Sequence, residues 1–315
     1  MIQHAELASR LQAVLASGPL TRLERLSGGA SRETWRLECD GRQLILQRLR
    51  RGAVTRLDLE VRVLDVAAAA GVPTPRVVLD GSRSDALERP FVIVEAIAGE
   101  SIARKILRDD AFSVARRQLP RQIAQAAART HAAPITELAA LSDADQVESL
   151  RSLLDGLGDP HPVFEIALRW LELHRPAPRP NVLVHGDLRL GNLLVTPSGL
   201  SGVLDWELSH LGSPAEDLAW MCVRAWRFGS GLPAAGLATR EQMLAHYAAE
   251  GGAVISLAEL RWWEVLGTLK WGLICIMQSQ THLRGLVQSH ELAILGRRVC
   301  ENEWDILQLL SPVPA

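Results

Sequence analysis

Three oxygen-bearing side chains near the middle of this 315-residue chain have the spacing that transfer of a phosphoryl group requires. Asp187 and Asn192 are five positions apart on one predicted loop, and Asp205 follows thirteen residues after Asn192. Phosphoryl transfer needs positioning and cancellation of charge more than covalent help, so one acceptor-orienting carboxylate and two oxygen ligands for Mg²⁺ suffice. We therefore expect Asp187 to accept the proton of the attacking hydroxyl, and Asn192 and Asp205 to bind Mg²⁺.

Short β-type runs must position these three residues. Residues 182–184 lead into the loop that carries Asp187, and residues 193–195 follow directly after Asn192. A Pro-Ser-Gly turn then reverses the chain into residues 203–204, which precede Asp205. Two runs joined by a tight turn pair side by side, so their outer ends should meet. The pattern therefore brings Asp205 back towards the loop from which the chain departed.

The residues quoted so far carry a family resemblance. The segment His185-Gly-Asp-Leu-Arg-Leu-Gly-Asn192, with Asp205-Trp-Glu207, resembles the signature of the aminoglycoside phosphotransferase and choline kinase superfamily, whose fold is similar to that of protein kinases. Within it, residues 203–220 are most similar to the kinase-like domain of acyl-CoA dehydrogenase family members 10 and 11 and their stand-alone bacterial relatives. The similarity extends from about residue 20 to about residue 280.

This resemblance implies an α+β, bilobal, protein-kinase-like fold. Residues 1–98 should form a small N-lobe, an antiparallel sheet plus a helix, that covers the nucleotide. Residues 99–315 should form a larger, mostly helical C-lobe with the catalytic loop and the acceptor-binding helices. The implied reaction is transfer of the γ-phosphoryl of ATP, with Mg²⁺ as cofactor, to the hydroxyl of a small molecule.

The resemblance also suggests roles for the neighbours of Asp187. His185 should brace the loop by bonding to backbone near Asp205, and we group it with Arg189 as a candidate catalytic residue. Arg189 would meet phosphate or an acidic acceptor, although a salt bridge within the loop is an equal alternative. Asp217 stands at a predicted helix start, where a structural cap or loop anchor is the favoured interpretation.

The nucleotide-covering loop is expected between the first two strands of a small antiparallel sheet, which we predict from about residue 20 to 49 because Asp40-Gly41 is a strong hairpin signal. Glycines there would let backbone N–H groups approach phosphates, although a plain turn is the alternative. The candidate residues of this loop are Ser27, Gly28, Gly29, Ala30 and Ser31.

The third predicted strand departs from the family pattern. Gln47 occupies the position of the lysine that meets the α and β phosphates, and strand alternation points the nearest cation, Arg48, to the opposite face. We expect a bulge or register shift that turns Arg48 inward, and the alternatives are a nucleotide held without that charge and a solvent-facing arginine. Glu60, on a predicted helix at 57–70, matches the family glutamate that pairs with the strand cation.

The resemblance places adenine at an interlobe hinge. Residues 90–99 form a buried strand that runs into a glycine, and backbone groups of Glu95, Ala96 and Ile97 should contact the base.

Composition limits the remaining function classes. A net charge of −2, from 34 basic and 36 acidic residues, provides no field that attracts nucleic acid or an anionic membrane. The most apolar long stretch, 262–277, contains Glu264 and Lys270, and the four cysteines show no metal or disulfide spacing. We expect a cytoplasmic protein that does not bind membranes, and its oligomeric state stays open.

The acceptor should be bound by predicted helices at 214–228, 237–249, 257–279 and 286–310. Few clustered carboxylates occur there, which disfavours an aminoglycoside or choline kinase proper. A hydroxyacyl-CoA-type alcohol is the acceptor that the dehydrogenase-linked relatives imply, and four basic residues are available for its phosphates: Arg224, Arg227, Lys270 and Arg284. A nucleotide-binding pseudokinase, suggested by Gln47, and a metal-dependent hydrolase are the alternative functions.

Overall fold

The structure is a computed structural model that describes residues 4–16, 18–26, 32–53 and 56–311. The chain divides into two compact units: the first holds residues 1–141 and 191–209, and the second holds residues 142–190 and 210–315. This division differs from the boundary at 98/99 that the sequence suggested.

The difference arises because the segment after the N-terminal sheet packs within the first unit. The amide of Glu100 donates to the carbonyl of Val195 at 2.9 Å, and the amide of Val195 donates back at 3.0 Å. Gln122 of α4 (Ser113–His131) accepts a hydrogen bond of 2.8 Å from the amide of Leu200. Residues on both sides of the expected boundary are therefore joined to the hairpin at 193–203.

An antiparallel sheet forms the core of the first unit, with strand order β1-β2-β3-β5-β4. Its strands are β1 (Leu20–Arg25), β2 (Arg32–Cys39), β3 (Arg42–Leu49), β4 (Val77–Gly81) and β5 (Phe91–Glu95). Asp40 and Gly41 both have positive φ, 51° and 71°, as a tight two-residue hairpin requires. The predicted hairpin is confirmed, and it pairs Cys39 with Arg42 and Arg32 with Leu49 without a break in register.

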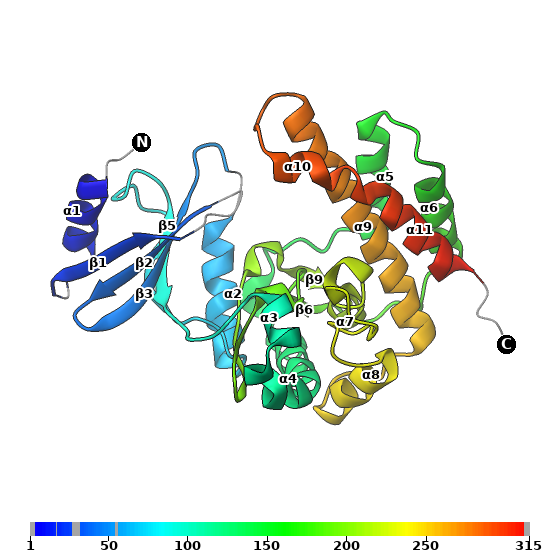
Figure 1. Cartoon of the computed structure of the whole chain (residues 1–315), viewed down its shortest axis with the longest axis horizontal. Coiled ribbons are helices and arrows are strands. Elements are labelled where there is room, and N and C mark those ends of the chain that lie inside the picture. Colours follow the sequence, from blue (N-terminus) through cyan, green and yellow to red (C-terminus); the bar gives the residue numbers. More distant parts are fainter. Residues whose placement is uncertain (1–3, 17, 27–31, 54–55, 312–315) are drawn as a thin grey trace. The chain divides into compact units, whose positions relative to one another are not determined.

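One helix lies on each side of this sheet (Figure 1). The helix α1 (His4–Leu15) places Leu7 and Leu11 in an apolar cluster with Trp35 and Leu46 of the sheet. The helix α2 (Leu57–Ala69) is amphipathic, and Glu60 is one of its buried residues. Because side chains alternate along a strand, β2 and β3 present one set of residues to α1 and the other set to the side of α2.

The remaining elements of the first unit include the hairpin that lies between the two predicted metal ligands, Asn192 and Asp205. They are α3 (Ala103–Arg108), the hairpin of β7 (Leu193–Thr196) and β8 (Gly199–Val203), and short 3-10 turns at Asp110–Phe112, Thr136–Leu138 and Trp206–Leu208. The last pair of the hairpin is Leu193 with Val203, so the residues just outside it, Asn192 and Leu204, lie at the same end.

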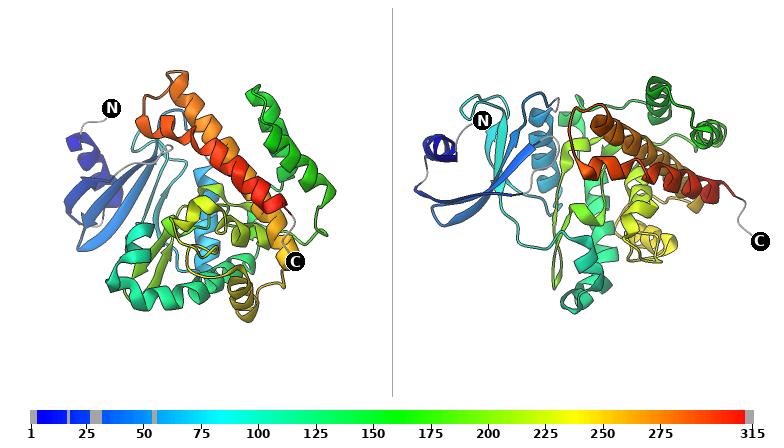
Figure 2. Two further views of the ribbon diagram at one scale, coloured as in Figure 1. Left: turned by 45° about the vertical axis from the view of Figure 1, so that its right-hand side comes forward. Right: turned by 45° about the horizontal axis from the view of Figure 1, so that its top comes forward.

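The second unit is mostly helical. Its elements are α5 (Gln146–Leu157), α6 (Pro162–Leu173), β6 (Val182–Val184), β9 (His210–Gly212), α7 (Pro214–Trp220), α8 (Arg240–Ala249), α9 (Leu257–Leu283), α10 (His290–Leu295) and α11 (Arg298–Leu310), with a 3-10 turn at Arg224–Arg227. The helix α11 lies along α9 in both views of Figure 2. The single helix predicted at 286–310 is two helices in the structure, α10 and α11.

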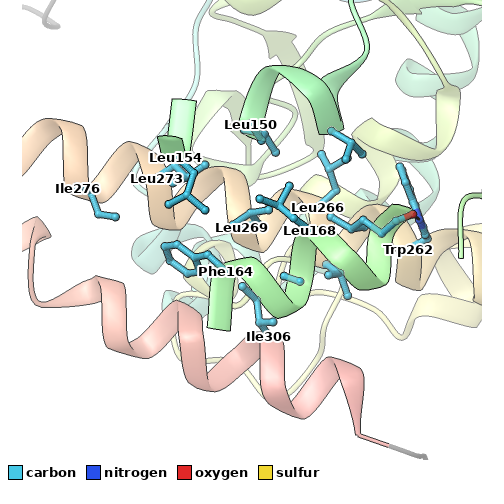
Figure 3. Close-up of a cluster of buried hydrophobic side chains, with 14 residues drawn as sticks. Leu150, Leu154, Phe164, Leu168, Trp262, Leu266, Leu269, Leu273, Ile276 and Ile306 are labelled. Carbon is cyan, nitrogen blue, oxygen red and sulfur yellow. Dashed lines mark hydrogen bonds between the residues drawn. The ribbon is translucent and has the colours of Figure 1, made fainter. Parts of the chain in front are cut away.

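The helix α9 supplies one side of the core of the second unit. Leu266, Leu269 and Leu273 follow helical spacing and pack with Phe164 of α6 and Ile306 of α11 (Figure 3). Burial of such aliphatic and aromatic side chains contributes about 1.5–3 kcal/mol each. The predicted combination of an antiparallel sheet followed by a mostly helical part is confirmed. In the described part of the chain, we find no helix with the length and apolar character that crossing a membrane demands.

Candidate active site

The predicted catalytic loop is anchored by one buried carboxylate of the second unit. Asp217, on α7, accepts hydrogen bonds from the amide of His185 at 2.8 Å and from the amide of Gly186 at 3.0 Å. Gly186 has φ of 81°, a conformation that side chains other than glycine rarely adopt. Because both carboxylate oxygens are used, the chain direction at the start of the loop is determined. The interpretation of Asp217 as a loop anchor is confirmed.

The same loop holds Asp187 in a definite orientation. The indole Nε1 of Trp220 donates to Oδ1 at 2.6 Å, and Nε of Arg189 donates to Oδ1 at 3.0 Å and to Oδ2 at 3.2 Å. The amide of Asp187 donates to Nδ1 of His185 at 3.2 Å. His185 therefore bonds to backbone of its own loop. Arg189 forms the salt bridge within the loop that was one of its two predicted roles.

Trp220, which bonds to Asp187, belongs to a group of three tryptophans that we call the tryptophan cluster: Trp220, Trp226 and Trp271. Ring centroids are 5.5 Å apart for Trp220 and Trp226 and 4.7 Å apart for Trp226 and Trp271. The guanidinium of Arg189 lies 4.6 Å from the ring centroid of Trp226, and Nζ of Lys270 lies 5.5 Å from that of Trp220. Cations over indole faces are stabilised by the ring quadrupole, so these two basic groups are held against the tryptophan cluster.

A second carboxylate, Glu216, lies under Lys270. It accepts from Nε2 of His210 at 2.8 Å, from Nζ of Lys270 at 3.4 Å and from the side-chain amide of Gln146. Burial by itself would raise the pKa of Glu216, but the hydrogen bond of His210 and the charge of Lys270 lower it below the ordinary value. Glu216 is therefore an anion with a cationic partner.

The two predicted metal ligands lie at the open end of the β7–β8 hairpin in the first unit. The amide of Leu204 donates to the backbone carbonyl of Asn192 at 2.8 Å, which extends the hairpin ladder by one hydrogen bond. Leu204 therefore lies opposite Asn192, and Asp205 follows directly after it. Asp205 has φ of 67°, a sparsely populated conformation that is frequent at functional sites. An amide and a carboxylate oxygen suit Mg²⁺, so the donor set fits the implied metal. In the ranges that the structure describes, no group of three or more His, Cys, Asp or Glu side chains is arranged to hold a metal ion.

Arg32, at the start of β2, pairs with the predicted site residue Glu60 and was not singled out in the sequence. Its Nη1 and Nη2 donate to the two carboxylate oxygens of Glu60 at 2.6 and 2.5 Å, and Nη2 also donates to Glu207 at 3.0 Å. Nη1 donates to the side-chain oxygen of Gln47 at 2.9 Å. Glu60 therefore pairs with a cation of β2 instead of β3.

The expectation for Arg48 is corrected by the same register. The ladder between β2 and β3 contains no bulge, and Arg48 lies opposite Glu33. Its guanidinium donates to Glu33 at 2.6 Å and to the carbonyl of Leu87 at 3.1 Å. Leu87 belongs to the apolar cluster under α1, so Arg48 points to the face away from Gln47 and Glu60.

The sequence contained a signal that leads to Arg32. A two-residue hairpin at Asp40-Gly41 sets the register of both strands, which places Glu33 opposite Arg48 and Thr34 opposite Gln47. Arg32 is then the diagonal neighbour of Gln47 on the same face of the sheet, within reach of a long side chain.

Other predicted nucleotide contacts are described only in part. The amide of Glu95 donates to the carbonyl of Arg76 at 2.9 Å, and the amide of Ala96 donates to the carbonyl of Gln43 at 3.0 Å. A base at this hinge would therefore meet carbonyls of these residues or the amide of Ile97. The predicted loop of Ser27, Gly28, Gly29, Ala30 and Ser31 lies outside the described residues.

Comparison with known proteins decides the family. Residues 22–263 match the sequence profile of the phosphotransferase enzyme family. The chain belongs to this phosphotransferase family. It is 29% identical over 223 residues to acyl-CoA dehydrogenase family member 10 of Mus musculus, an alignment that covers 66% of this chain. The aligned part is 21% of the mouse protein, so the chain corresponds to about a fifth of that relative.

Solved structures of similar fold support the predicted kinase-like architecture of this phosphotransferase. A Ralstonia eutropha protein provisionally named an aminoglycoside phosphotransferase aligns with a TM-score of 0.75 and 22% identity, covering 95% of this chain and 98% of its own. A choline/ethanolamine kinase family protein of Mesorhizobium loti aligns with a TM-score of 0.68 and 19% identity, covering 97% and 95%. The predicted fold class is confirmed.

Proposed function

We propose that this phosphotransferase is an ATP-dependent kinase that phosphorylates a hydroxyl group of a small molecule. The observation that carries the proposal is the orientation of Asp187. Trp220 and Arg189 hold its carboxylate, while Asp217 holds the backbone that precedes it. We propose that a carboxylate fixed in this way orients the attacking hydroxyl and takes its proton as charge develops.

Mg²⁺ is the cofactor of this proposal, and Asn192 and Asp205 are the residues that would hold it. When bound, it supplies charge neutralisation for the phosphates of the nucleotide. The chain's own contribution is the hairpin of β7 and β8, whose ladder places both oxygen donors at one end. Asp205 is exposed, and its carboxylate is a hard anionic ligand.

The acceptor is proposed to be an alcohol without positive charge. Both carboxylates described around the tryptophan cluster have cationic partners, Arg189 for Asp187 and Lys270 for Glu216. This pairing leaves little attraction for an aminoglycoside or for choline. Nε1 of Trp226 is buried and has no acceptor among the described residues, so an oxygen of the substrate would satisfy it.

A hydroxyacyl-CoA fits this chemistry and is the acceptor that we favour. The mouse relative is named an acyl-CoA dehydrogenase family member, and CoA carries phosphates that need basic partners. Of the four basic residues considered for them, Arg227 already pairs with the buried Glu264 at 3.0 Å. Arg224, which pairs with Asp305 at 3.3 Å, is largely exposed, and Lys270 lies beside the tryptophan cluster. Lys270 also pairs with a buried carboxylate, Glu216, so Arg224 and the exposed Arg284 are the better candidates.

The pseudokinase alternative was motivated by the neutral Gln47. That motivation is weakened, because Arg32 supplies a cation that contacts both Gln47 and Glu60. The contacts of Arg32 therefore favour a catalytic function over a pseudokinase.

The proposal is tested with MgATP and a panel of acceptors: hydroxyacyl-CoA of several chain lengths, the free hydroxy acids, choline and an aminoglycoside. We expect ADP formation that depends on a hydroxyacyl-CoA, with a phosphate ester in the product by ³¹P NMR. Asp187→Asn should lower kcat by about 10²–10⁴-fold. ADP formation that survives this substitution unchanged rules out the assignment of Asp187. MgATP binding without turnover on any acceptor would favour the pseudokinase.

A further inference from the structure

The position that normally carries the phosphate-binding cation is neutral in this chain. Gln47 points to the side of the sheet where Glu60 lies, and its side-chain oxygen accepts a hydrogen bond from Arg32. Arg48, the next residue, is engaged with Glu33 on the other face. A nucleotide bound at this sheet would therefore need its cation from elsewhere.

Arg32 is held as rigidly as such a cation requires. Its two Nη atoms bond to the two oxygens of Glu60 in a fork, the strongest geometry for this pair, and both side chains are 7% exposed. Burial by itself would lower the pKa of Arg32, but the hydrogen bond and charge of Glu60, joined by two further carboxylates, raise that pKa above its ordinary value. The charge of Arg32 is therefore permanent.

Two features leave this guanidinium with capacity for another anion. Its Nε is buried and finds no acceptor among the described residues, which is unusual for a buried donor. The contact of Nη2 with Glu207 involves a side chain that is 26% exposed, so an incoming anion can replace it more easily than the buried Glu60. The backbone carbonyl of Arg32 accepts a hydrogen bond of 3.3 Å from Nε of Arg50.

We propose that Arg32 is the residue of this chain that binds the α and β phosphates of the nucleotide, in place of a cation on β3. Glu60 positions its guanidinium, and a phosphate oxygen takes the contact that Glu207 makes in the structure. In this proposal the cation lies on β2 instead of β3. It is residue 32, the diagonal neighbour of residue 47 across the two strands. This inference rests on the proposed function, since it concerns the nucleotide of that reaction.

The test measures the dissociation constants of MgADP and of adenosine by calorimetry, so that no acceptor is needed. We expect Arg32→Gln to weaken MgADP binding by about 10- to 100-fold, the value of one or two charge-assisted hydrogen bonds, with adenosine binding unchanged. The double variant Arg32→Gln/Gln47→Lys should regain most of the lost affinity, because it returns a cation to β3 beside Glu60.

Control variants separate binding from folding. Arg48→Gln changes the other buried arginine of the sheet and should leave the MgADP constant unchanged. Arg32→Gln/Glu60→Gln leaves no unpaired buried charge, and it should show the same loss of MgADP affinity with a normal thermal transition. If Arg32→Gln alone fails to fold, this double variant replaces it.

Each other outcome overturns the inference. Undiminished MgADP binding by Arg32→Gln, an equal loss for adenosine, no recovery with Gln47→Lys, or a comparable loss in Arg48→Gln would each remove the role of Arg32 and leave the proposed kinase function standing. Absence of MgADP and MgATP binding by the wild-type protein would instead overturn the proposed function together with this inference.

Discussion

The indole Nε1 of Trp220 donates a hydrogen bond of 2.6 Å to Oδ1 of Asp187. Trp220 ends the helix that also carries Asp217, so one short helix orients both the backbone and the carboxylate of the catalytic loop. Trp220→Phe keeps an aromatic but smaller ring and deletes one hydrogen bond to a charged group, which is worth about 1.5–3 kcal/mol. We expect kcat to fall by about 10- to 100-fold, with little change in the KM for ATP. Trp271→Phe is the matched control, because it changes a tryptophan of the same cluster that has no assigned polar contact within the described residues. An equal effect of both variants on kcat would contradict the specific role of Trp220.

The anchor itself is tested with Asp217→Asn. An asparagine accepts through one oxygen only, so its amide group would face the N–H of His185 or Gly186 and leave that donor unpaired. An unsatisfied buried group costs about 1–3 kcal/mol, and we expect the free energy of unfolding to decrease by that amount in urea titrations. The rate should fall with it. Unchanged stability and kcat would show that the loop keeps its conformation without this carboxylate.

The pair of Glu33 and Arg48 predicts a pH-dependent stability. Burial by itself would raise the pKa of Glu33, but Arg48 outweighs it and, with Arg89, lowers that pKa below its ordinary value. Because the pKa of Glu33 is lower in the folded state, its ionised carboxylate stabilises the fold at pH values above the unfolded pKa, about 4.3. This stabilisation is lost as the pH falls through the pKa of the folded state. Arg48→Gln should therefore cost about 1–3 kcal/mol at pH 7 and clearly less near pH 3. Urea titrations at both pH values measure this, and a cost that does not change with pH would exclude the ion pair as its origin.

The proposed metal ligand Asp205 predicts a shift in the demand for Mg²⁺. Asp205→Asn removes the anionic ligand and keeps the size of the side chain, so the Mg²⁺ concentration for half-maximal rate should rise by about 10-fold or more. Titration of the rate with Mg²⁺ at constant ATP measures this. Ser201→Ala, in the same hairpin, is the control that should leave the titration unchanged. If Asp205→Asn has the titration curve of the wild-type protein, the carboxylate is not a ligand.

Local patterns in the sequence determined much of this protein. The spacing of His185, Asp187 and Asn192 indicated the catalytic loop, and Asp40-Gly41 set the register of β2 and β3, because a two-residue turn permits only one pairing. The predicted helices at 57–70 and 257–279 correspond to α2 and α9, although the latter extends to Leu283. These features depend on residues close to one another in the chain, so the sequence alone was sufficient.

Tertiary structure decided which partner each charged or polar group meets. Glu60 and Arg32 are 28 positions apart, and Asp187 and Trp220 are 33 positions apart, so spacing along the chain does not by itself select either pair. The partner of each group depends on the face of the sheet to which its side chain points. It also depends on which donor reaches the lone pairs of a buried carboxylate. The hairpin register settles the face of the sheet, but the partner is settled only when helices α2 and α7 pack in place, because burial makes an unpaired polar group costly.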